Sequence, residues 1–320
     1  MECELEACRD DDSVKELVKK CLSSSGGMEN VERLWPNQLD EHSYSKLTSF
    51  FLEGCPKLLN VFPLSMLMRL QKLENLSIWN CESLEEIICE SQSQEINVSA
   101  MQSLSPQLIQ SNVITFEFPC LPSLTLIALP NLKSICHKTQ TISWHLLKKM
   151  EVYGCNKVEI LFASQEISRS INEQPLFWVN KYMFPNLHQL TLGWNVGVKE
   201  IWRLVPSSVP FQNLVILEIE EIIEGGDNND QDEISFPQLN SLELESLPKL
   251  ESFCSSWNYT FGFPSLQIVI VEDCPKMKIF SQRHSNTPML NEVEFYWSGC
   301  YEERWENDLN STIQQFFREH

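Results

Sequence analysis

The sequence predicts an α/β solenoid, in which short parallel strands form a concave sheet, irregular segments return over the convex side, and a short helix caps the C-terminal end. Three observations predict this fold class. Nearly the same phrase occurs twice, as "FPQLNSLELESLPKLESF" at 236–253 and as "FPSLQIVIVEDCPKMKIF" at 263–280. Related phrases occupy 44–62 and 70–87. Within each phrase apolar and polar residues alternate, as a strand with one buried face requires.

The repeats keep a regular spacing. The pattern Leu-x-x-Leu-x-Leu, with other apolar residues at some of its later positions, begins at nine leucines: Leu47, Leu73, Leu121, Leu147, Leu187, Leu214, Leu239, Leu266 and Leu290. Most intervals are 24 to 27 residues, and two longer intervals, of 48 and 40, indicate inserted segments. This period and pattern are typical of leucine-rich repeats, which form a horseshoe of parallel strands. Because the returns are too short for a full crossover helix, each coil is expected to stack on the one before it.

Each coil also has fixed apolar positions between its strands. In four coils a Cys stands three residues after the second buried strand residue, at Cys55, Cys81, Cys155 and Cys274. A small side chain at this position tucks beneath the turn that leaves the strand, and a free Cys behaves there as a small apolar residue. A Phe-Pro pair closes four coils in front of the next strand, at Phe118, Phe184, Phe236 and Phe263. We expect all these side chains to be buried.

The predicted domain organisation has three parts. Residues 31–300 form the leucine-rich-repeat solenoid, after a partial N-terminal repeat and a short helix or linker at 1–30. A C-terminal cap helix occupies 301–320, with Asn310 as the expected N-cap residue. Polar stretches interrupt the repeats and are expected to be loops that project from single coils, near 89–115, 163–182 and 224–233.

Composition narrows the function classes. The chain has 320 residues, is 42% hydrophobic and carries a formal net charge of −20, which is unfavourable for binding nucleic acid or an anionic membrane. No stretch is apolar enough to span a membrane, and the acidic start lacks the features of a signal peptide. These features predict a cytoplasmic protein. Twelve cysteines include no Cys-x-x-Cys pair, so the sequence predicts no metal and no other cofactor.

Catalysis is not predicted either. None of the six histidines stands in a motif that pairs it with a nucleophile, and no Gly-x-Ser-x-Gly motif occurs. The Gly-rich loop that ends in Lys-Ser or Lys-Thr and binds nucleotide phosphates is not in this sequence. We therefore expect a non-catalytic protein that does not bind or hydrolyse ATP.

Two long phrases carry a family resemblance. "LWPNQLDEHSYSKLTSFFLEGCPKLLNVFPLSMLMRLQKLENLSIWNCESLEEI" and "FPNLHQLTLGWNVGVKEIW" resemble the leucine-rich-repeat region of plant intracellular disease-resistance receptors of the coiled-coil, nucleotide-binding class. The resemblance runs from about Val31 to the C-terminus. It implies that the repeats recognise a pathogen effector or a guarded host protein and restrain a nucleotide-binding switch. It also implies that the chain is a C-terminal portion of a receptor or the product of a truncated gene.

A ubiquitin-ligase substrate adaptor is the alternative function, because leucine-rich repeats serve in that role too. Such an adaptor usually has an additional helical docking module. The first thirty residues offer only "SVKELVKKCL", which is enough for a short helix and too short for a domain. Co-purification of a ligase component with the chain would favour this alternative.

Two sets of outward-facing strand residues are candidate protein contacts. The first is an aromatic patch on the N-terminal concave surface, and its members are Phe51, Trp79 and Tyr153. Aromatic residues are enriched as anchors at protein interfaces. The alternative for this set is that the rings only cover neighbouring strands.

The second set is acidic and lies on the C-terminal concave surface. One column holds Glu218, Glu243 and Glu294, with Ile270 between the last two, and the next column holds Glu220, Glu245 and Glu272. Like charges on neighbouring strands repel, and neither column contains Lys or Arg over these strands. The sequence therefore predicts a site for a basic protein partner, which the nucleotide-binding module of the receptor could supply. The alternative is a solvated acidic face that repeat duplication has copied.

Overall fold

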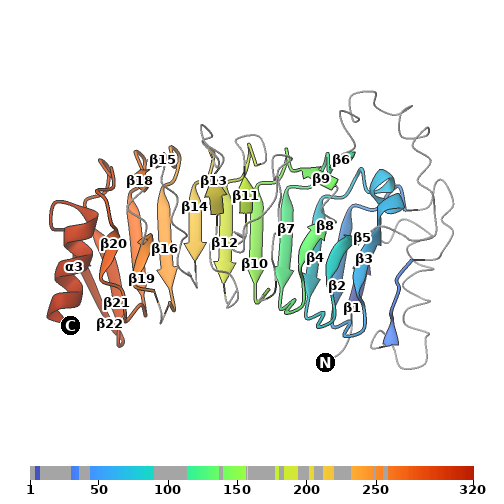
Figure 1. The fold of residues 1–320 in the computed structure, drawn as a ribbon, viewed down its shortest axis with the longest axis horizontal. Helices are drawn as coiled ribbons and strands as arrows, with labels where there is room; N and C mark the ends of the chain where they lie inside the picture. The colour runs from blue at the N-terminus through green and yellow to red at the C-terminus, as the bar shows by residue number, and fades with distance from the viewer. Residues whose placement is uncertain are drawn as a thin grey trace. The chain divides into compact units, whose positions relative to one another are not determined.

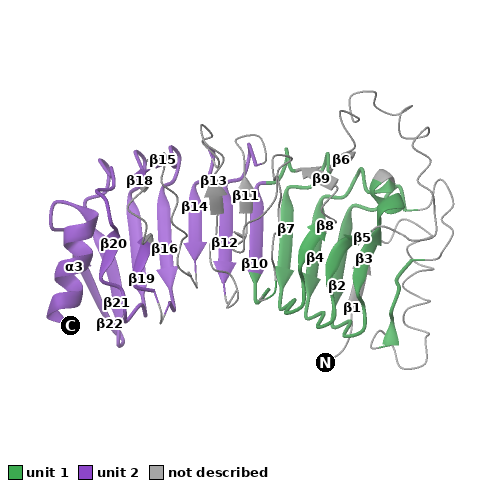
Figure 2. Cartoon of the chain, viewed as in Figure 1, with its two compact units in different colours: residues 1–147, 153–169 green, residues 148–152, 170–320 purple. Residues whose placement is uncertain are grey.

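The computed structural model describes thirteen stretches of the chain. They are 4–7, 30–35, 44–89, 114–136, 140–155, 157, 177–179, 184–193, 202–204, 212–219, 232–247, 250–254 and 259–320. The chain divides into two compact units (Figure 2): unit 1 holds residues 1–147 and 153–169, and unit 2 holds 148–152 and 170–320. The predicted insertions lie largely outside the described residues, as do Glu220 and most of 1–30.

A main strand follows each of the nine leucines that begin the repeat pattern (Figure 1). These strands are β2 (Ser49–Glu53), β4 (Asn75–Trp79), β7 (Ser123–Ile127), β10 (Lys149–Tyr153), β12 (Gln189–Gly193), β14 (Ile216–Ile219), β16 (Ser241–Glu245), β19 (Ile268–Glu272) and β21 (Val293–Trp297). Pairing between consecutive main strands is parallel for β2-β4-β7 in unit 1 and for β12-β14-β16-β19-β21 in unit 2. The division between the units falls within β10. The predicted parallel-sheet solenoid is confirmed.

Two further strands pair antiparallel with main strands. Strand β1 (Glu4–Ala7) pairs with β2, and β22 (Cys300–Arg304) pairs with β21. The antiparallel direction of β1 distinguishes it from the strands of the repeats. The expected partial repeat at 1–30 stays a prediction, because the remainder of that segment lies outside the described residues.

The returns contain short strands as well, and are more regular than the sequence indicated. In unit 1 these are β3 (Asn60–Pro63), β5 (Glu86–Cys89) and β8 (Ser134–Cys136), and the pair β6 (Ile114–Glu117) and β9 (Gln140–Ser143). In unit 2 they are the pairs β11 (Phe177–Val179) and β13 (Trp202–Leu204), β15 (Asp232–Ser235) and β18 (Tyr259–Gly262), and β17 (Ser252–Cys254) and β20 (Ile279–Ser281). A 3-10 helix, η2 (Leu64–Arg69), follows β3. All the return strands pair parallel, because stacked coils of similar length bring equivalent backbone segments side by side.

The core is built from the repeated apolar positions. All nine leucines that begin the repeat pattern are buried, with at most 4% of their surface exposed. The Phe of each Phe-Pro pair is also buried, and Phe236 stacks on Phe263 with ring centroids 5.4 Å apart. Trp144 fills the same position in its own coil and stacks on Phe118, although no proline follows it. In these two pairs the aromatic residue of one coil packs against that of the next, as the sequence predicted.

A turn residue with a positive φ angle follows most main strands. Five of these residues are not glycine: Asn80, Ala128, Ser246, Asp273 and Ser298. The left-handed conformation turns the chain inward, so that the next residue, such as Cys81, is buried beneath the turn. Its thiol lies 3.3 Å from the carbonyl oxygen of Trp79. The predicted burial of all four repeat cysteines is confirmed.

The C-terminal end of unit 2 consists of β22 and the helix α3 (Leu309–Glu319). Residues 301–304 belong to the strand, so the helix begins later than the predicted range of 301–320. The N-cap residue is Asp308, whose carboxylate accepts a hydrogen bond from the Ser311 amide at 3.0 Å. The prediction that Asn310 is the N-cap is wrong, because its side chain bonds to the backbone of the preceding coil instead. Inside the cap, Phe316 stacks on Phe295 at 3.8 Å between centroids.

Candidate protein-binding surface

The main strands expose one face of the sheet in each unit. Along β16 the burial alternates: Leu242 and Leu244 are buried, whereas Ser241, Glu243 and Glu245 are only partly covered. We call the side away from these buried residues the open face. Because the pairing is parallel and in register, equivalent residues of successive coils lie side by side on this face, about 4.8 Å apart.

Register pairs bring the predicted acidic residues together in unit 2. Glu218 lies directly opposite Glu243, and Glu245 lies directly opposite Glu272. Ile270 separates Glu243 from Glu294, as the sequence indicated. Glu220 lies outside the described residues, so its place in the second column stays a prediction.

The acidic surface continues onto a strand that sequence reasoning missed. Glu303 of β22 lies directly opposite Glu294, because the hairpin between β21 and β22 folds the last strand back against the sheet. The sequence "YWSGCYEER" could have predicted this hairpin, because Ser-Gly between two runs of polar and aromatic residues is typical of a hairpin turn. We call these six glutamates the acidic ladder: Glu218, Glu243, Glu245, Glu272, Glu294 and Glu303.

Mutual repulsion within the ladder affects protonation. Burial, followed by the charges of Glu218 and Glu245, raises the pKa of Glu243 above its ordinary value. Partial desolvation and then the charge of Glu245 raise the pKa of Glu272. Because both pKa values are raised, the ionised form of each carboxylate is less stable in the folded chain than it would be in water. The arrangement costs stability and favours a cation on the open face.

Uncharged hydroxyl groups donate hydrogen bonds to some of the carboxylates of the ladder. The hydroxyl of Thr191 donates to Glu218 at 2.6 Å, and the hydroxyl of Tyr296 donates to Glu294 at 3.3 Å. The Tyr301 hydroxyl donates to Glu303. Within the described ranges no ion pair reaches a carboxylate of the ladder.

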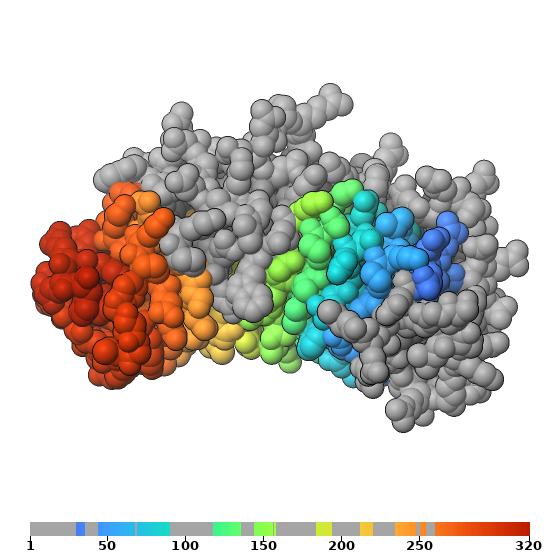
Figure 3. Space-filling model, turned by 90° about the horizontal axis from the view of Figure 1, so that it is seen from below, coloured from blue at the N-terminus to red at the C-terminus, as the bar shows by residue number. Residues whose placement is uncertain are grey.

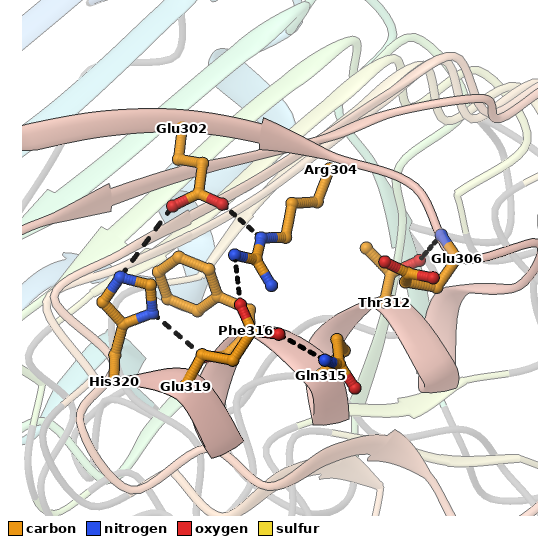
Figure 4. A network of polar contacts seen from close by, with 8 residues as sticks. All are labelled: Glu302, Arg304, Glu306, Thr312, Gln315, Phe316, Glu319 and His320. Atoms are coloured by element: carbon orange, nitrogen blue, oxygen red, sulfur yellow. Dashed lines mark hydrogen bonds and ion pairs between the residues drawn. The ribbon is translucent and has the colours of Figure 1, made fainter.

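Arg304, a basic side chain that neighbours Glu303 in β22, forms its ion pairs with residues outside the ladder (Figure 4). Arg304 forms ion pairs with Glu302 and Glu319, and its guanidinium lies 5.6 Å from the ring centroid of Phe316. His320 lies 3.8 Å from the second carboxylate oxygen of Glu302. The hydrogen bonds that Arg304 donates to Glu319 and Glu302 raise the pKa of its guanidinium above the ordinary value. This network joins β22 to α3 on the side opposite Glu303, so Arg304 does not neutralise the ladder.

The aromatic candidates lie in unit 1. The rings of Phe51 and Trp79 are half-buried and meet edge to face, with centroids 5.4 Å apart. The indole nitrogen of Trp79 is buried without a hydrogen-bond partner among the described residues. Tyr153 is also half-buried, and the backbone bonds of successive strands place Ile127 between Trp79 and Tyr153. The structure thus brings two of the three aromatic candidates into contact.

The described residues offer no arrangement for metal chemistry. No group of three or more His, Cys, Asp and Glu within the described ranges is placed to hold a metal ion. The helices of the described ranges are too short or too polar to span a lipid bilayer. What the open face can do is bind through charge, hydrogen bonds and aromatic contact.

Stacked parallel strands, repeated leucines and an open face define the class: a leucine-rich-repeat solenoid, which is typically a non-catalytic protein-binding module. Residues 19–173 match the family of plant disease resistance protein RPS2-like, leucine-rich repeats. This part of the chain is similar to the leucine-rich-repeat region of plant disease-resistance proteins, in line with the resemblance seen in the sequence. Searches of the curated proteins and of the solved structures gave no match.

Proposed function

We propose that the chain is a protein-binding module of a plant disease-resistance receptor, and that its acidic ladder binds a basic surface of a protein partner. The observation that carries the proposal is the pairing of Glu218 with Glu243 and of Glu245 with Glu272 on neighbouring strands. Ionised carboxylates at this spacing destabilise the sheet, and Lys or Arg from a partner would relieve the repulsion.

The partner that fits this chemistry best is the nucleotide-binding module of the receptor. A ladder that holds this module through charge would restrain the switch until a pathogen effector or a guarded host protein competes for the repeats. The match of residues 19–173 to resistance-protein repeats supports this setting. The contact of Phe51 with Trp79 in unit 1 supports a second role, as an aromatic anchor for the recognised protein, to which Tyr153 would add.

Charge reversal of the ladder tests the proposal. The variant carries Glu243→Lys, Glu245→Lys and Glu272→Lys, and its binding to the separately expressed nucleotide-binding module is measured by calorimetry at two salt concentrations. We expect at least a tenfold loss of affinity at low salt and a smaller loss at high salt, because screening already weakens the parent interaction there.

A matched control variant has the same net charge as the triple lysine variant of the ladder. Three exposed glutamates of unit 1, Glu32, Glu74 and Glu82, are changed to Lys together. This control alters the net charge equally but leaves the ladder intact, so its affinity should fall much less. Equal losses for the two variants would show that only the overall charge of the chain matters, and the proposed role of the ladder would then be wrong.

A further inference from the structure

The last strand of the sheet, β22, presents one backbone edge that no described element pairs with. Strand β22 ends the order of the large sheet, and only β21 lies beside it. The two strands are joined by a two-residue turn, Ser298 and Gly299, whose φ angles are 50° and 79°. Positive φ at both positions defines the tight hairpin turn in which the flanking residues, here Trp297 and Cys300, form a hydrogen-bonded pair.

The hairpin register fixes which backbone groups point outward. Hydrogen-bonded and non-hydrogen-bonded pairs alternate along an antiparallel ladder. Cys300, Glu302 and Arg304 therefore direct their amide and carbonyl groups toward β21. Tyr301 and Glu303 direct theirs away from it. No described residue forms a hydrogen bond with these outward groups of Tyr301 and Glu303.

The helix α3 leaves this edge uncovered. Its contacts with β22 run through the side chains of Glu302 and Arg304, which point toward Glu319 and His320 (Figure 4). These side chains project from the face of β22 opposite Tyr301 and Glu303, since alternate residues of a strand face opposite ways. The C-terminal part of unit 2, to which β22 and α3 belong, is drawn orange to red in Figure 3.

Side chains beside the edge are suited to a cationic residue. Tyr296 and Tyr301 face each other across the hairpin with ring centroids 5.0 Å apart, and 36% and 52% of their surfaces are exposed. Glu294 and Glu303 flank them on the same face. An aromatic ring and a carboxylate side by side bind a guanidinium or an ammonium group through cation-π contact and charge-assisted hydrogen bonds.

A second copy of the chain does not fit this edge. Pairing of β22 with β22 of another copy would bring Glu303 and Glu294 of both copies onto one continuous face. Charged residues on an edge strand are a common means by which proteins prevent such self-association. The occupant must therefore carry the opposite charge.

We propose that the β22 edge binds an extended basic segment of a partner protein by strand addition, with Arg or Lys at alternate positions against Tyr301 and Glu303. The inference rests on the proposed function in one respect, because it supplies a binding mode for the basic partner of the ladder. Main-chain hydrogen bonds to Tyr301 and Glu303 would give affinity, and the period of two along a strand would select the spacing of the basic residues.

Synthetic peptides test the proposal on the unchanged chain. The probe is a fluorescein-labelled Thr-Arg-Thr-Arg-Thr-Arg peptide, and a peptide of the same composition with its three arginines in one block is the charge-matched control. Two further versions carry N-methyl groups, either on the three Arg amides or on the three Thr amides. Binding is followed by fluorescence anisotropy at low salt.

Strand addition predicts a one-sided effect of methylation. In an added strand, amides of one parity face β22 and those of the other parity face away. We expect one methylated peptide to bind at least tenfold more weakly than the probe, while the other stays within threefold of it. The blocked peptide should also bind more weakly. The proposal is overturned if both methylated peptides bind as the probe does, if both lose binding equally, or if the probe does not bind.

Two variants of Glu303 locate the edge. Glu303→Gln removes the charge, whereas Glu303→Pro removes the charge and the outward amide, and proline is tolerated where an edge amide faces solvent. We expect the proline variant to bind the probe about threefold to tenfold more weakly than the glutamine variant, which is the effect of one net hydrogen bond. Equal binding by the two variants would contradict pairing at this edge. If the proline variant does not fold, the methylated peptides on the native chain decide the question alone.

These variants also separate this inference from the proposed function. Glu303 belongs to the ladder as well as to the edge, but both variants remove its charge, so the difference between them reports only the outward amide. The triple lysine variant, in turn, leaves the backbone edge of β22 unchanged. If the peptides show no strand addition but the triple lysine variant still loses affinity for the module, only the proposed role of the β22 edge is wrong. If the triple lysine variant binds the module as tightly as the parent does, the proposed role of the ladder is wrong, while peptide binding at the β22 edge is unaffected by that result.

Discussion

The side chain of Asn310 ties the cap helix to the last complete coil, and its removal should loosen the C-terminal end of unit 2. Its carbonyl oxygen accepts hydrogen bonds from the amides of Phe280 and Ser281, at 3.1 and 3.0 Å. Its amide nitrogen donates to the carbonyl oxygens of Ser281 and Arg283, at 3.0 and 3.2 Å. Asn310 therefore pairs with β20 much as a neighbouring strand would.

The structure gives the expected size of the effect of Asn310→Ala. Four hydrogen bonds at about 1 kcal/mol each, reduced by about 0.5 kcal/mol for the better helix propensity of alanine, amount to about 3.5 kcal/mol. Phe280 and Ser281 are 0% and 1% exposed, so water can replace few of the lost bonds. In a repeat architecture the loss should appear as local opening of the cap rather than as global unfolding.

Hydrogen exchange measures this opening directly. A loss of about 3.5 kcal/mol should lower the protection of the α3 amides roughly 300-fold, while amides of β2 and β4 in unit 1 keep theirs. Gln314→Ala is the matched control, because Gln314 lies on the same helix and its side chain accepts a single, long hydrogen bond among the described residues, from Arg318 at 3.5 Å. The reasoning is refuted if the two variants lower the protection of α3 by the same factor.

Two further predictions follow from ionisable groups. Because burial and neighbouring carboxylates raise the pKa of Glu243, its ionised form is disfavoured on folding. Glu243→Gln should therefore increase the free energy of unfolding at pH 7 and have little effect near pH 4, as urea titrations at both values would show. Burial raises the pKa of Cys155 and of Cys274 to about 12, whereas Cys300 is exposed. Iodoacetamide at pH 8 should label Cys300 much faster than those two thiols, and peptide mapping that finds equal rates would contradict their burial.

The sequence by itself determined the class of fold and much of the core. A period near 25 residues with two inward residues in each strand can be satisfied only if successive coils cover one another, so Leu239 and its eight equivalents had to be buried. The same period implied that Glu243 and Glu218 would be neighbours on the open face, because parallel coils of similar length keep their register. Local rules of spacing were sufficient for both.

Tertiary structure decided the ends and the turns. Residues such as Ala128 adopt positive φ because the coil must turn inward there, and no local signal marks an alanine for that conformation. Asn310 looked like a helix cap in the sequence, but its four partners belong to a coil some 30 residues earlier. Only the fold could bring that backbone within reach of its side chain. The same is true of Glu303, which joins the ladder because β22 reverses direction and lies against β21.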